Sequence, residues 1–116
     1  MTIKRPVQGW DIQRVTTHPG AILRDNFMEP AGLSANRLAM RTGIPATRVG
    51  EIIHGRRGVS SDTALRFARF FGTSAEFWLN LQAAYDLSKT RNEIGQIIQH
   101  EIQPFAFEAV GPNQAR

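Results

Sequence analysis

Seven arginines stand between residues 34 and 71 of this 116-residue chain, and only two acidic residues, Glu51 and Asp62, balance them. That segment therefore carries a formal charge of +5, whereas the whole chain carries +4. A guanidinium group binds a phosphate through two parallel hydrogen bonds and also matches the acceptor edge of guanine. Solvated helix faces can carry the same residues, so it is the placement of these arginines that favours nucleic-acid binding.

The same segment has the residue spacing of a helix-turn-helix, in which two short helices are joined by a tight turn. Ser34 is a suitable N-cap for the first helix, and Gly43 permits the positive φ of the turn. Ala39 is small enough for the second helix to approach closely, and Val49 ties that helix into the core. Pro45 suits the first position of the second helix, where a missing N–H costs nothing. This motif places its second helix in the major groove of DNA.

Side chains on the outward and leading side of the second helix are expected to read bases. They are Ala46, Thr47, Arg48 and Glu51. Ala46 could touch a thymine methyl group. Glu51 could accept a hydrogen bond from a cytosine amino group or orient Arg48 from one helical turn away.

A second set of residues is expected to contact phosphates and so to position the protein on the duplex. The set comprises Ser34, Arg37, Arg41, His54, Arg56 and Arg57. Two alternatives stay open at this point. His54 could cap the last carbonyls of its helix, and Arg56 with Arg57 could belong to a solvated loop.

Prolines, glycines and capping residues divide the rest of the chain into helices. A helix is predicted from Pro19 to about Met28, ended by Pro30 and Gly32, and the helix-turn-helix occupies about 34–54. The next helix is predicted over 62–71, and its expected core stripe consists of Ala64, Leu65, Phe67, Ala68 and Phe71. The pattern thus predicts an all-α fold.

A T-x-x-E capping box formed by Thr73 and Glu76 opens a fifth helix over about 74–89. A further amphipathic stretch over 93–103 is weakened by Gly95 and ended by Pro104. The expected organisation is an N-terminal arm (1–17), a DNA-binding domain (18–90), and a C-terminal helical extension and tail (91–116). The tail at 105–109 is either a short strand-like segment or a frayed end.

The fifth helix is apolar on two sides, and the second of these is formed by Leu79, Ala83 and Leu87. A helix of this kind is either deeply buried or shared with a partner. One recognition helix covers too few base pairs to select a site in a genome, which favours a homodimer with this stripe as its interface. The stretch over 93–103 carries four isoleucines at helical spacing, Ile94, Ile97, Ile98 and Ile102.

Catalysis and metal binding are poorly supported by the sequence. The three histidines are widely separated and there is no cysteine, so neither a metal site nor a cofactor is predicted. An H-E-x-x-H pattern begins at His100 but meets Pro104 where its second histidine belongs. The N-terminus lacks a signal-type apolar region and no long apolar run follows, so the expected location is the cytoplasm.

Residues 18–87 carry a more specific pattern. The opening HPG, the IPATRV and GRRG segments, and the ending FGTSAEFWLNLQAAYDL together resemble the HigA antitoxin family, within the XRE group of helix-turn-helix proteins. The resemblance implies a five-helix, phage-repressor-like, helix-turn-helix domain that forms a homodimer and binds a palindromic operator; residues 93–103 would then be an additional C-terminal amphipathic helix. It also implies a HigB-type toxin partner, an mRNA-cleaving ribonuclease that the antitoxin neutralises by direct binding. The 93–103 stretch would extend the dimer interface or receive the toxin.

Two other functions remain in competition with that of an autorepressing antitoxin. The chain could be a stand-alone repressor of the same fold without a toxin. It could also be a protein-interaction module whose helix-turn-helix does not bind DNA, although the seven arginines argue against this.

Overall fold

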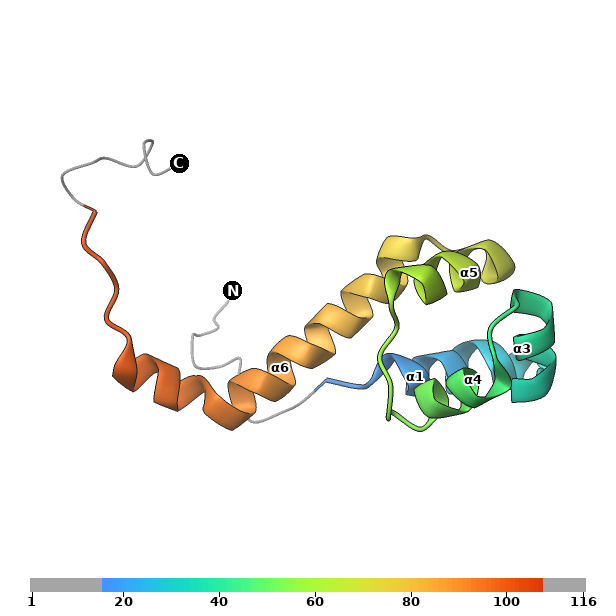
Figure 1. The fold of residues 1–116 in the computed structure, drawn as a ribbon, viewed down its shortest axis with the longest axis horizontal. Coiled ribbons are helices and arrows are strands. Elements are labelled where there is room, and N and C mark those ends of the chain that lie inside the picture. Colours follow the sequence, from blue (N-terminus) through green and yellow to red (C-terminus); the bar gives the residue numbers. More distant parts are fainter. Residues whose placement is uncertain (1–15, 108–116) are drawn as a thin grey trace, which may run out of the picture.

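The computed structural model describes residues 16–107, and every regular element within that range is helical (Figure 1). A first helical segment comprises α1 (Pro19–Ile22), the π-helical stretch η1 (Leu23–Met28) and α2 (Glu29–Ala31). It is followed by α3 (Ala35–Thr42), α4 (Ala46–Ile53), α5 (Ser61–Phe71) and α6 (Ala75–Glu101). The all-α prediction is therefore confirmed. Most of the expected N-terminal arm and the end of the tail lie outside the described residues.

The first helical segment runs three residues further than expected, because Pro30 does not end it. The backbone N–H of Glu29 bonds to the carbonyl of Arg24, five residues back, which widens the turn before the proline. A proline ring crowds the carbonyl of the preceding helical turn and offers no N–H, so a widened turn relieves the conflict. The segment ends instead at Gly32, which adopts a left-handed conformation with φ 64°.

The core is centred on Trp78, which is fully buried near the start of α6. Its ring lies 5.0 Å from that of Phe27 and 5.1 Å from that of Phe67. The indole N–H donates to the hydroxyl of Thr73 at 2.8 Å. The predicted capping box is therefore wrong: Ser74 rather than Thr73 is the N-cap, and its hydroxyl accepts from the N–H of Phe77 at 3.0 Å.

The expected core stripe on α5 is wrong at Leu65, whose side chain is 63% exposed. Successive residues turn by 100° around a helix, so Leu65 lies well round the surface from Ala64, whereas Phe67 and Phe71 lie close to the line of Ala64. The helix buries Thr63, Ala64 and Phe67 and leaves Leu65 outside.

Helix α6 is a single helix of 27 residues, and it replaces the two helices expected over 74–89 and 93–103. Gly95 does not interrupt it, because one glycine costs only about 1 kcal/mol in a helix interior. Its first half packs on α5, and its second half projects away from the other helices (Figure 1).

The projecting half of α6, with Ile102 directly after it, exposes large apolar side chains that are 41–63% exposed: Leu87, Ile94, Ile97, Ile98 and Ile102. At 100° per residue, Leu87, Ile94 and Ile98 lie together on the side of the helix opposite to Trp78 and Tyr85. The row, called here the α6 ridge, therefore faces away from the core. Between residues 16 and 107, none of the helices combines the length and hydrophobicity that a membrane span requires.

Candidate nucleic-acid interface

The turn between α3 and α4 has the geometry that its residues predict. The hydroxyl of Ser34 accepts from the N–H of Arg37 at 3.1 Å and caps α3. Gly43 follows with φ 75°, and Ile44 behind it is buried. Pro45 is the N-cap of α4, so the helix begins at Ala46, one residue later than expected.

Helix α4 has a buried side and an open side. Val49 and Ile52 are completely buried, while Ala46 and Thr47 are exposed and Arg48 is half-buried. The expected base-reading residues therefore lie off the buried stripe. They remain predictions as base contacts.

Helix α1 packs against the last turn of α4, where the backbones of the two helices come very close. An ideal Cβ placed on Gly20 would lie 1.8 Å from the carbonyl oxygen of Ile52, in the last turn of α4. Only a residue without a Cβ permits this distance. The N-terminus of α1 is itself capped by His18, whose Nδ1 accepts from the N–H of Gly20 at 2.8 Å.

One alternative for Glu51 was a pair with Arg48 that would orient this arginine, and the structure shows a different partner. Its carboxylate accepts instead from Nε of Arg57, six residues later, at 2.7 Å. This ion pair holds the loop after α4 against the outer side of the helix. Both side chains are about half exposed, so the pair contributes at most about 1 kcal/mol.

His54 lies at the end of α4, as expected if it caps the last carbonyls of that helix. Its Nδ1 is 2.8 Å from the carbonyl oxygen of Gly50, a distance at which the ring caps that carbonyl. Gly55 then turns the chain with φ 74°, and Arg56 and Arg57 follow as exposed residues of the loop.

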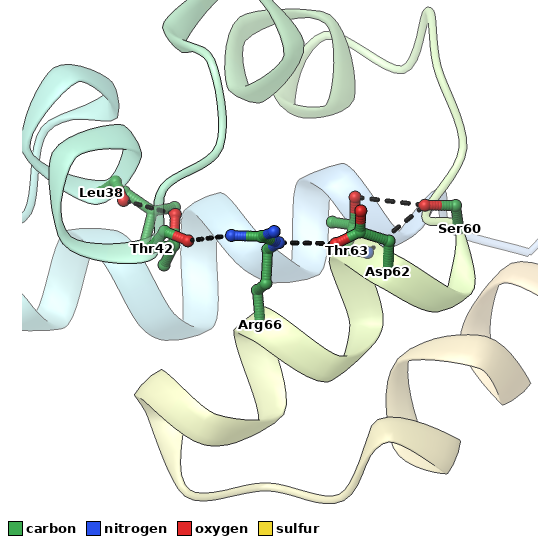
Figure 2. A network of polar contacts seen from close by, with 6 residues as sticks. All are labelled: Leu38, Thr42, Ser60, Asp62, Thr63 and Arg66. Carbon is green, nitrogen blue, oxygen red and sulfur yellow. Dashed lines mark hydrogen bonds and ion pairs between the residues drawn. The ribbon is translucent and has the colours of Figure 1, made fainter.

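A polar network fastens α5 to the end of α3, and Figure 2 shows it with Arg66 at its centre. The guanidinium group donates to the carbonyl of Thr42 at 2.9 Å and also to the carboxylate of Asp62. The hydroxyl of Thr42 in turn donates to the carbonyl of Leu38 at 2.7 Å. The pair with Arg66 is the largest cause of the lowered pKa of the Asp62 carboxyl.

Sequence reasoning missed the role of Arg66, which had been counted only as charge. The i, i+4 spacing from Asp62 could have predicted the ion pair. The bond to Thr42 joins residues 24 positions apart and depends on how the helices pack, so no local signal could have found it.

The residues expected at phosphates come from several parts of the motif. Ser34 and Arg37 lie at the start of α3, and Arg56 and Arg57 follow α4. Arg41 lies near the end of α3, with its guanidinium group 5.3 Å from the centre of the Phe70 ring on α5. All of them remain predictions as phosphate contacts.

Comparison with known proteins agrees with this geometry. A helix-turn-helix family model matches residues 26–78. The chain is 46% identical over 76 residues to virulence-associated protein I of Dichelobacter nodosus, covering 66% of this chain and 70% of that protein. It is 39% identical over 74 residues to antitoxin HigA-1 of Vibrio cholerae, covering 63% and 69%.

A solved structure of the antitoxin HigA of Pseudomonas aeruginosa with the higBA promoter has a TM-score of 0.76 to this structure, at 42% identity. The superposition covers 78% of this chain and 98% of that chain. Fold and motif thus define an XRE-type helix-turn-helix protein. Within that class, the chain belongs to the HigA family of antitoxins.

Proposed function

We propose that this protein is an antitoxin that binds its operator as a homodimer, represses its own operon, and neutralises a HigB-type toxin by direct binding. The observation that carries the proposal is the extent of the match to a HigA antitoxin solved with promoter DNA, which covers 98% of that chain. Binding to chromosomal operator DNA would place the protein in the cytoplasm. The family is one of DNA-binding regulators and not of enzymes.

Charge and exposure on the motif support the DNA-binding part of the proposal. Thr47 is exposed on α4, and Arg56 and Arg57 are exposed in the loop that follows. Arginines flanking a recognition helix neutralise phosphates and release counterions, which makes affinity fall steeply with salt.

The homodimer is supported by the outer side of α6. Leu79 is partly buried against the core, so the expected stripe of Leu79, Ala83 and Leu87 is not entirely free for a partner. Ala83 is exposed, and so is Leu87, which is the first residue of the α6 ridge. In the proposed dimer, a second copy covers this row, and the two recognition helices occupy successive turns of the duplex, about 34 Å apart.

A salt titration of operator binding tests the DNA-binding part. Replacing Arg56 by Gln should lower the slope of log affinity against log salt by about 1, because one phosphate contact is lost. The Lys89→Gln variant removes the same charge from α6 and should leave the slope unchanged. Weak binding with no salt dependence in the wild-type protein would favour the interaction module.

Co-expression with a HigB-type toxin tests the antitoxin part. The antitoxin should co-purify with the toxin and abolish its mRNA cleavage. Operator binding without any toxin complex would instead identify a stand-alone repressor. The two experiments fail independently, so each separates one competing function.

A further inference from the structure

An open groove lies between the end of α3 and the outer side of α5, where Figure 2 shows Arg66 crossing from one helix to the other. Its lining consists of Arg41, Thr42, Asp62, Leu65, Arg66, Arg69 and Phe70. None of the expected base-reading residues belongs to this lining. The groove is therefore a surface that the proposed function does not use for sequence recognition.

The groove is electropositive. It contains three arginines and one carboxylate, and that carboxylate, on Asp62, already pairs with Arg66. Arg41 and Arg69 therefore leave an excess of positive charge along the groove. A complementary partner has to be acidic.

The groove also offers apolar surface. Leu65 is 63% exposed, on a helix that buries its other large apolar side chains at least partly. Phe70 also lines the groove and carries the Arg41 guanidinium group on its ring at 5.3 Å. Apolar and aromatic side chains framed by arginine are typical of protein interfaces, whereas phosphate binding needs no exposed leucine.

Two of the three guanidinium groups are held in place before any partner arrives. Arg66 is fixed by the carbonyl of Thr42 at 2.9 Å and by Asp62, and Arg41 is stacked on Phe70. Side chains that are already ordered lose less conformational entropy on binding. A prearranged charged groove favours a specific ligand over diffuse attraction.

We propose that the groove between α3 and α5 is a docking site for an acidic segment of a partner protein, which inserts an apolar side chain against Leu65 and Phe70. The carboxylates of the segment pair with Arg41 and Arg69. The groove is lined by residues of α3 and α5 alone, so Thr47 on α4 lies outside it.

The test uses a fluorescent synthetic peptide of glutamates with a leucine at every third or fourth position, titrated against the full chain. Leu65→Ser should weaken binding about tenfold, since one buried leucine contact contributes about 1.5 kcal/mol or more. Arg69→Gln should weaken it by up to about fivefold, as expected for an exposed ion pair. Both side chains are exposed, so both variants should keep the wild-type denaturation midpoint.

Control peptides separate the two parts of the proposal. Replacing the leucines by serines, or the glutamates by glutamines, should each abolish detectable binding. Amide chemical shifts in the wild-type protein should change at the groove residues. Failure of the acidic peptide to bind, or shifts centred on Arg56 and Arg57, would overturn the docking site.

Operator binding distinguishes this proposal from a phosphate-binding function for the groove. Leu65→Ser and Arg69→Gln should both leave operator affinity and its salt slope unchanged. A slope lowered by about 1 in Arg69→Gln would make the groove a DNA contact and refute the proposal. If the wild-type protein does not bind operator DNA at all, the proposed function is refuted and the docking site is not.

Discussion

Replacing Gly20 by alanine should strongly destabilise the protein, because α1 and α4 touch at this residue. The added methyl group would lie 1.8 Å from the carbonyl oxygen of Ile52, and that oxygen belongs to the backbone of a helix. A flexible side chain cannot move aside here, so the two helices would have to separate by more than an ångström. Overpacking of this kind costs about 3 kcal/mol, the upper end of the usual range.

Chemical denaturation of Gly20→Ala beside Gly50→Ala measures this effect. Gly50 lies inside α4, and a Cβ there meets nothing within 4 Å, so alanine should stabilise the protein by about 0.5–1 kcal/mol. For Gly20→Ala, a loss of about 3 kcal/mol corresponds to a melting temperature lower by about 12–24 °C. Equal stabilities of Gly20→Ala and the wild type would refute the close approach of α1 to α4.

Three other perturbations test different parts of the molecule. Burial lowers the pKa of His18, against a smaller opposing effect of Asp86, so the folded protein favours the neutral ring. The free energy of unfolding should therefore fall as pH drops below about 6.5. Denaturation curves measured across pH should show a weaker dependence for His18→Asn, which keeps an acceptor for the helix cap. Arg48→Ala should cost about 1–3 kcal/mol of operator affinity and relax preference at one or two base pairs, whereas undiminished discrimination against scrambled DNA would remove Arg48 from the reading surface. Leu87→Asp should yield a folded monomer with much weaker operator binding, because an unpaired carboxylate at an interface is unfavourable, and sedimentation equilibrium showing an unchanged dimer would place the interface elsewhere.

The turn of the motif could be predicted from the sequence because its chemistry is local. A serine hydroxyl caps a helix start, and a glycine accepts a positive φ, whatever surrounds them; Ser34 and Gly43 behave accordingly. Val49 was predicted as core because its spacing from Ile52 places both on one side of a short helix. Both are fully buried.

The errors arise where several local solutions compete and packing selects among them. Thr73 and Ser74 are both capable N-caps, and Thr73 is occupied by the indole N–H of Trp78. One alternative paired Glu51 with Arg48, and the fold of the loop brings Arg57 to it instead. The break expected between residues 89 and 93 is wrong as well: residues 90–92 contain neither proline nor glycine, and α6 continues through them.

The length of α6 has a mechanical consequence for any assembly that pairs two copies along the ridge. At 1.5 Å per residue, Glu101 lies about 35 Å from Trp78 along the helix. A small rotation of α6 about the aromatic core therefore becomes a large displacement at its C-terminal end. A tilt of α6 by about 5° at Trp78 moves Glu101 by about 3 Å, close to the rise of one base pair. In such an assembly, the angle between α5 and α6 would determine the spacing of the two DNA half-sites. The packing around Trp78, and not a DNA contact, would set that angle.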